Sequence, residues 1–81
     1  MRMVCISKNK DILLGLRIAG VEVFHIKDDK KIIEKIQELA SDANVGILNV
    51  TEDVYDVAED EIKQIQNNQE MPLIVKIPNT K

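Results

Sequence analysis

The sequence predicts one α/β domain over residues 1–81, in which a four-stranded parallel sheet carries helices on both faces. Four short runs rich in Ile, Val and Leu alternate with three stretches of helical spacing, in the order βαβαβαβ. Strict alternation of this kind favours parallel strands joined by right-handed helical crossovers. With 81 residues the chain has room for one core, because a domain near this size buries only about 60% of the surface that its unfolded chain exposes.

The first strand is expected at residues 3–6, an apolar run of strand length. Asn9 or Asp11 then caps a helix over residues 11–19, since short polar side chains accept hydrogen bonds from the free N–H groups of a helix start. Gly20 marks the end of this helix, because glycine commonly follows a helix C-terminus. The helix is apolar nearly all round, whereas one sheet face needs only one apolar stripe.

The second strand is expected at residues 21–26, which are rich in β-formers, and Asp28 or Asp29 caps the helix that follows. Apolar residues recur there at helical spacing, opposite a face of alternating Lys and Glu that i,i+4 pairs would support. The predicted apolar face consists of Ile32, Ile33, Ile36, Leu39, Ala40 and Ala43.

The third strand is expected at residues 45–50, and Thr51 is the predicted N-cap of the third helix. Glu52 and Asp53 then place negative charge at the positive end of the helix dipole. A fourth strand is expected at residues 73–77, between two prolines. The apolar stripe of the third helix consists of Val54, Ala58, Ile62 and Ile65.

We expect the strand order 2-1-3-4, the order of flavodoxin-like and receiver-like folds. That order places the first helix alone on one face and the other two helices on the opposite face, so the sheet is unevenly covered. Two interpretations of the apolar surplus in the first helix stay open. Either the small core uses it, or a partner covers part of it together with the bare sheet around the third and fourth strands.

Composition argues against several classes of ligand. The net charge is −3 and no basic block is present, so the sequence lacks the electrostatic footprint of a nucleic-acid-binding protein. With no Trp, one Phe and one Tyr, a stacked cofactor is not expected. The apolar run at residues 12–16 ends at Arg17, far short of the roughly 20 residues of a membrane-spanning helix. The single Cys5 is interpreted as a small buried side chain in a reducing cytoplasm.

No catalytic, metal or cofactor residues are predicted. The carboxyl edge of the predicted sheet brings together Ser7, His25 and Glu52, a set that could mimic a hydrolase triad. However, Ser7 lies on no Gly-x-Ser-x-Gly turn. A phosphoryl receiver needs an aspartate at the end of the third strand, where this chain has Asn49. His25 has no second His or Cys at metal spacing, and is expected to hold one backbone or water partner.

Three stretches resemble the F subunit of the vacuolar/archaeal-type (V-type/A-type) rotary ATPase: residues 10–21, 46–52 and 71–78. The first is the most specific, with Gly15, Arg17 and the run Ala19, Gly20 and Val21 in register. The resemblance covers essentially the whole chain. It implies a further helical tail after the last Ile-Pro, whereas residues 79–81 end the sequence, so we expect the tail to be absent from residues 1–81.

The resemblance implies a non-catalytic rotor subunit that binds the coiled-coil D subunit in the central stalk, and through it the A/B catalytic head and the membrane rotor. Such a protein helps to couple ATP turnover to ion transport, and is cytoplasmic and peripheral to the membrane. A degenerate receiver-like signalling module and a small enzyme using the Ser7 edge are the alternatives. The partner-binding residues we expect are Leu13, Leu16, Arg17, Ile74 and Lys76.

Overall fold

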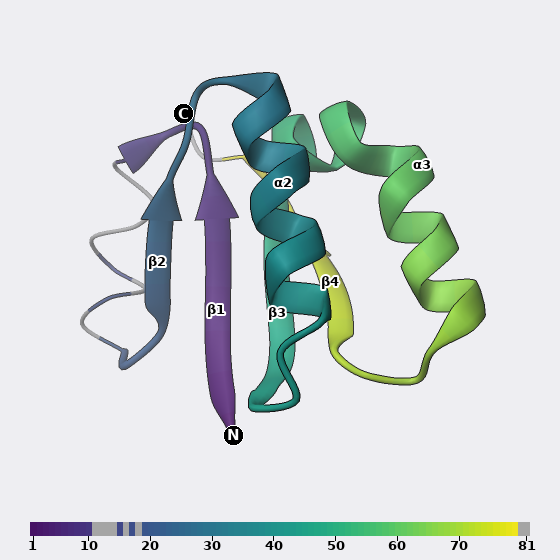
Figure 1. The fold of residues 1–81 in the computed structure, drawn as a ribbon. Coiled ribbons are helices and arrows are strands. Elements are labelled where there is room, and N and C mark those ends of the chain that lie inside the picture. The colour runs from purple at the N-terminus through teal and green to yellow at the C-terminus, as the bar shows by residue number, and fades with distance from the viewer. Residues whose placement is uncertain (11–14, 16, 18, 80–81) are drawn as a thin grey trace.

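The alternating pattern folds into one parallel sheet, with the strand order β2-β1-β3-β4 that the sequence predicts (Figure 1). The structure is a computed structural model that describes residues 1–10, 15, 17 and 19–79. The strands are β1 (Arg2–Ser7), β2 (Glu22–His25), β3 (Val45–Thr51) and β4 (Leu73–Ile77), and the described helices are α2 (Asp29–Ala40) and α3 (Glu52–Asn68).

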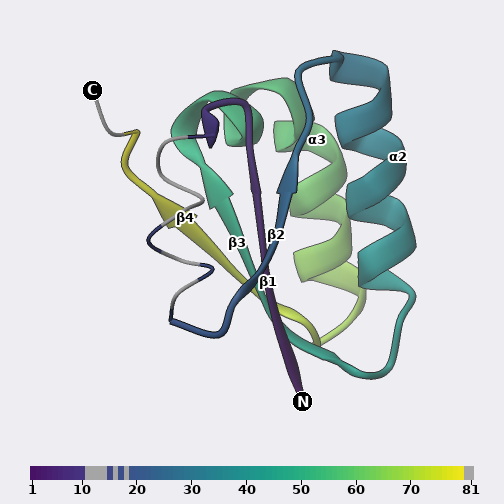
Figure 2. The ribbon, with the colours of Figure 1, turned by 90° about the vertical axis from the view of Figure 1, so that its left-hand side faces the viewer.

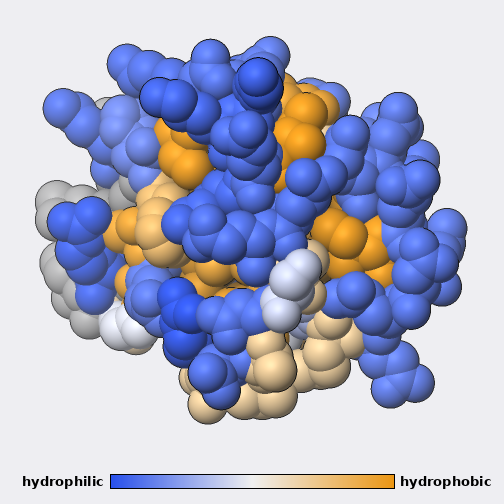
Figure 3. Space-filling view, in the orientation of Figure 1, coloured by the Kyte–Doolittle hydropathy of each residue, from blue (hydrophilic) through white to orange (hydrophobic). Residues whose placement is uncertain are grey.

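Both described helices lie on the same side of the sheet (Figures 1 and 2). Residues that alternate along the central strands, among them Val4, Ile6, Leu48 and Val50, point toward these helices and are fully buried. Hydrophilic side chains cover the outward surface of α2 and α3, and hydrophobic ones are visible in the seams between them (Figure 3). From the helices, the core receives Ile32, Ile36, Leu39, Val54, Ala58 and Ile62.

The predicted first helix falls mostly outside the described residues, and with it Asp11, Leu13, Leu16 and the expectation of a helix on the second face. Its end is described. The Ala19 N–H donates to the Gly15 carbonyl at 3.2 Å, and the Gly20 N–H donates to the Arg17 carbonyl at 3.1 Å. Gly20 has φ +87°, the left-handed conformation that favours glycine after a helix, which confirms the predicted end.

Asp28 is the N-cap of α2, since its carboxylate accepts a hydrogen bond from the Lys31 N–H at 2.9 Å. The prediction that Ala43 extends the apolar face is wrong, because the helix ends at Ala40 and Ala43 is exposed. Asp42 explains this end: its carboxylate accepts from the Asn44 N–H at 2.9 Å, the local hydrogen bond by which aspartate favours a turn over a helix.

Thr51 occupies the N-cap position of α3, as predicted, but its side chain makes no hydrogen bond to the helix backbone. Its hydroxyl donates instead to the carboxylate of Asp53, which accepts from the Val54 N–H at 2.8 Å. Asp53 therefore supplies the capping oxygen that the sequence pattern assigned to Thr51. The helix bends at the buried Ala58, whose φ of −115° and ψ of 20° are not helical.

Candidate interaction surfaces

The carboxyl edge of the sheet is where open α/β folds bind ligands, and two of its polar side chains, Ser7 and Asn49, are engaged within the chain. Ser7 is fully buried, and its Oγ accepts from the Asn9 N–H at 2.9 Å and donates to the Asn9 carbonyl at 3.1 Å. Asn49 on β3 donates through Nδ2 to the Val4 carbonyl at 3.2 Å. These side chains tie neighbouring segments together.

The three residues of the alternative enzyme hypothesis make their side-chain hydrogen bonds to other residues of the described chain and not to one another. His25 is exposed, and its Nε2 lies 2.9 Å from the Lys8 carbonyl oxygen, in agreement with the expectation of one backbone or water partner. Glu52 accepts from the Asn79 N–H at 3.1 Å. Within the described part of the chain, no hydrogen bond joins any two of Ser7, His25 and Glu52. They form no catalytic relay.

The buried thiol of Cys5 lies on β1, on the sheet face opposite α2 and α3. Desolvation raises its pKa to about 11, so the neutral thiol dominates at physiological pH. In the part of the chain that the structure describes, no three His, Cys, Asp or Glu side chains are grouped to hold a metal ion. None of the described helices is long and apolar enough to cross a membrane.

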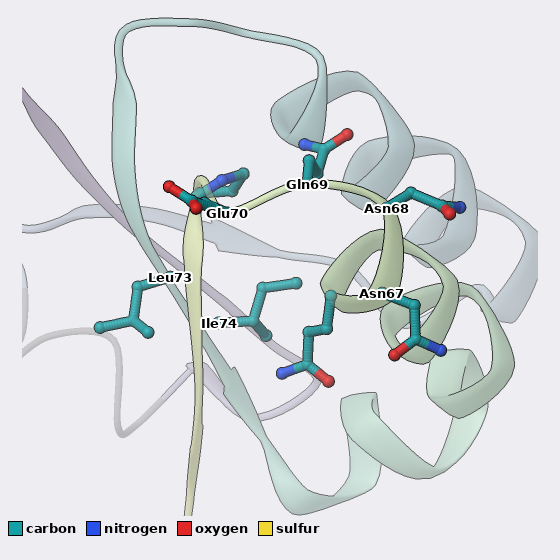
Figure 4. Close-up of a pocket in the computed structure, with 8 residues that line it drawn as sticks. Asn67, Asn68, Gln69, Glu70, Leu73 and Ile74 are labelled. Atoms are coloured by element: carbon teal, nitrogen blue, oxygen red, sulfur yellow. The ribbon is translucent and has the colours of Figure 1, made fainter.

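Neighbouring residues of β4 project to opposite sides of the sheet. Ile74 packs against the helix-side core, and the Lys76 ammonium lies 4.7 Å from the centre of the Tyr55 ring on α3. Ile74 and Lys76 therefore lie on the helix side of β4, away from the second face. Leu73 projects away from α3 in Figure 4, and strand alternation puts Val75 and Ile77 on the same side as Leu73. Whether Ile74 and Lys76 contact a partner stays a prediction.

An apolar row crosses this second face of the sheet. Met3 on β1 is in register with Ile47 on β3, and Ile47 is in register with Leu73 on β4. Met3 is 41% exposed and Leu73 is 57% exposed, while Ile47 is half-buried. Met71, which is 45% exposed, precedes Leu73 by two residues. We refer to Met3, Ile47 and Leu73 as the apolar row; such a group on a surface is typical of a contact site.

A shallow hollow of about 480 Å³ adjoins the end of the apolar row, where α3 connects to β4 (Figure 4). Gln69 fastens this connection, since its Nε2 donates to the Ala40 carbonyl at 2.8 Å and to the Met71 carbonyl at 2.6 Å. Glu70 is the only ionisable residue of the lining. The lining is made mainly of amide side chains and holds no cluster of ionisable groups. Such a lining suits contact with a protein better than catalysis. The lining residues are Gln66, Asn67, Asn68, Gln69, Glu70, Pro72, Leu73 and Ile74.

A second hollow, of about 320 Å³, lies where β1 and β2 end. It is lined by Lys8, Lys10, His25 and Lys27, together with Asn9, and we refer to the four basic residues as the basic edge. Sequence reasoning missed it because the residues come from two segments that the parallel pairing of β1 and β2 brings together. The signal that could have revealed this hollow is the presence of lysines shortly after both β1 and β2, whose ends lie side by side in the sheet.

Comparison with known proteins gives a consistent result. A family model described as ATP synthase (F/14-kDa) subunit matches residues 3–81. The F subunit of the V-type ATP synthase of Fusobacterium nucleatum is 31% identical over 81 residues, which are 100% of this chain and 75% of that protein. The F subunit of the A-type ATP synthase of Methanocaldococcus jannaschii is 29% identical over 72 residues, which are 88% of this chain and 68% of that protein.

The fold is also similar to a solved structure. The crystal structure of the F subunit of the V-type ATP synthase from Archaeoglobus fulgidus superposes with a TM-score of 0.73. The alignment covers 94% of this chain and 96% of that chain, at 17% identity. At this level of identity the likeness supports the fold.

Proposed function

Because the chain belongs to the F-subunit family of the V-type and A-type ATP synthases, we propose that it is a non-catalytic component of the central stalk, bound to the coiled-coil D subunit. The match of the family model to residues 3–81 is the observation that carries the proposal. In this role the chain rotates with the D subunit and helps to couple ATP turnover in the A/B head to ion transport by the membrane ring. Its place is on the cytoplasmic side, peripheral to the membrane.

The state of the polar side chains supports a role without catalysis. Ser7 is buried and bonded to Asn9, Asn49 is bonded to the neighbouring strand, and the thiol of Cys5 is buried with a raised pKa. A nucleophile needs an exposed reacting atom, and Ser7 and Cys5 are both fully buried. ATP chemistry would then belong to the other chains of the complex.

The second sheet face supports binding to a helical partner. Parallel sheets occur almost only where helices cover both faces. On the second face of this sheet, Met3 and Leu73 of the apolar row remain exposed. A helix of the coiled coil laid on the apolar row would complete the helix–sheet packing. We also propose the contacts predicted from the sequence, namely Leu13, Leu16, Arg17, Ile74 and Lys76. Because Ile74 and Lys76 lie on the helix side of β4, they would meet the partner at a different part of the surface from the apolar row.

Co-expression with a tagged D subunit from the same genome, followed by gel filtration, tests the proposal. We expect a complex with one copy of each chain, and expect Leu73→Asp to weaken it at least about tenfold because a charge would enter an apolar contact. Gln64→Asp on the exposed surface of α3 is the control, since it adds the same charge away from the row. Ile74→Asp is unsuitable, because its side chain packs against the core.

Circular dichroism of the isolated variants must show that both remain folded. The docking face is misplaced if folded Leu73→Asp binds the D subunit as tightly as the Gln64→Asp control. The function itself is wrong if the unmodified chain forms no complex with the D subunit.

A further inference from the structure

The basic edge concentrates positive charge on a chain whose net charge is −3. Lys10, His25 and Lys27 are exposed, and Lys8 is half-buried. Three ammonium groups and one imidazole thus surround one hollow at the end of β1 and β2. By contrast, α3 holds six acidic residues and one lysine, so this end of the sheet differs in charge from that helix.

The acidic residues beside the basic edge are engaged elsewhere or neutralise only part of it. Asp29 pairs with Lys8, with the carboxylate oxygen 2.9 Å from the ammonium nitrogen. Asp28 accepts from the Lys31 N–H as the cap of α2. Lys10 and Lys27 take part in none of the ion pairs among the described residues. Two lysines are therefore available to a ligand.

The construction of the site selects the class of ligand. A small oxyanion is usually held by backbone N–H groups of a glycine-containing loop, and residues 7–11 contain no glycine. Flexible exposed ammonium groups alone hold such an ion weakly, because water screens them and their side chains lose freedom. A nucleic acid needs a longer basic stripe than four residues. A protein segment with several carboxylates meets the same lysines together with the surface around them.

We propose that the basic edge binds Asp and Glu side chains of the partner protein, which on the proposed function is the coiled-coil D subunit. Exposed charge pairs of this kind act mainly on the rate and orientation of association. A local positive end on an acidic chain turns that end toward an acidic stretch of the partner. The apolar row would provide the buried part of the contact, and the basic edge would select how the two proteins meet.

The rate of association with the purified D subunit tests the proposal, measured by stopped flow at two salt concentrations. We expect Lys10→Gln/Lys27→Gln to slow association about tenfold at roughly 0.1 M salt, where the Debye length is about 10 Å. At roughly 1 M salt, where it is about 3 Å, the variant and the unmodified chain should associate equally fast. Gln37→Glu/Gln64→Glu is the matched control, since it changes the net charge by the same amount on exposed parts of α2 and α3.

The possible results separate this inference from the function on which it rests. A loss of rate confined to Lys10→Gln/Lys27→Gln and to low salt supports the basic edge. Equal rates for both double variants and the unmodified chain overturn the basic edge and leave the stalk function standing. If both variants slow association to the same extent, net charge is responsible and the basic edge is again overturned. If the unmodified chain does not bind the D subunit, both proposals fail.

Discussion

The guanidinium of Arg2 holds the carboxylate of Glu22 by two hydrogen bonds, from Nε at 2.7 Å and from Nη2 at 3.0 Å. The same guanidinium donates to Asp42 at 2.6 Å, and the Arg2 N–H donates to the Asn44 carbonyl at 2.7 Å. One residue at the start of β1 thereby fastens the start of β2 and the connection between α2 and β3. Bidentate arginine–carboxylate pairs are among the stronger polar contacts of a protein surface.

The first prediction concerns the pH dependence of this contact. The hydrogen bond from Arg2 lowers the pKa of Glu22, so the ionised carboxyl stabilises the folded chain above its unfolded pKa. That contribution is lost as the pH falls through the lower pKa of the folded state. Urea unfolding should find Glu22→Gln less stable than the unmodified chain at neutral pH, with the difference vanishing at acidic pH, once the pH lies below the lowered pKa of Glu22.

Glu34→Gln is the control for this experiment, because Glu34 is exposed on α2 and outside the ion pairs of the described residues. Its stability should follow that of the unmodified chain at both pH values. A Glu22→Gln variant that loses nothing at neutral pH would contradict a stabilising role for the pair.

The second prediction contrasts two leucines on opposite faces of the sheet. Leu48 is fully buried against α2 and α3, so Leu48→Ala leaves a cavity and should cost about 2–5 kcal/mol in unfolding free energy. Leu73 is 57% exposed in the apolar row, and Leu73→Ala should change stability by about 0.5 kcal/mol or less. Urea unfolding measures both, and similar losses would mean that Leu73 belongs to the core.

The third prediction contrasts two glycines. Gly20 has φ +87°, which a side chain disfavours even though nothing lies within 4 Å of an added Cβ, so Gly20→Ala should destabilise the fold by about 1 kcal/mol. Gly15 is helical, with equally open space, and Gly15→Ala should stabilise it by about 0.5–1 kcal/mol. Thermal unfolding should therefore show shifts of opposite sign, and equal shifts would contradict the difference in backbone conformation.

The fourth prediction concerns the thiol of Cys5. A pKa of about 11, against an ordinary value of 9.0, lowers the thiolate fraction near neutral pH about a hundredfold, and burial blocks the reagent as well. Labelling with Ellman's reagent at about pH 8 should be slower by at least that factor in the folded chain than in urea. Equal rates in the two conditions would show that Cys5 is accessible.

Most of the fold was predictable because its signals are local and agree with one another. Asp28 before the spaced isoleucines and Gly20 after the first apolar stretch marked helix ends that the structure confirms. Ala43 was misplaced because a tertiary contact, between Arg2 and Asp42, helps to hold the turn that ends α2. Spacing along the helix carries no information about that contact.

The interaction surfaces were less predictable because they depend on which side a side chain faces and on which segments meet. A shift of one position moves a strand residue to the other face, and this separates the predicted Ile74 from the exposed Leu73. Lys10 and Lys27 are 17 positions apart in the sequence and line one hollow only because β1 pairs with β2.

The central claim is that this chain joins the rotary ATPase through the stalk, and reconstitution with the catalytic A/B head tests it most directly. Native gel electrophoresis of the head would be compared with and without the D subunit, adding this chain to each. We predict that this chain migrates with the head only when the D subunit is present. We also predict that the head hydrolyses ATP without this chain. Binding to the A/B head in the absence of the D subunit, or no binding in its presence, would contradict the claim.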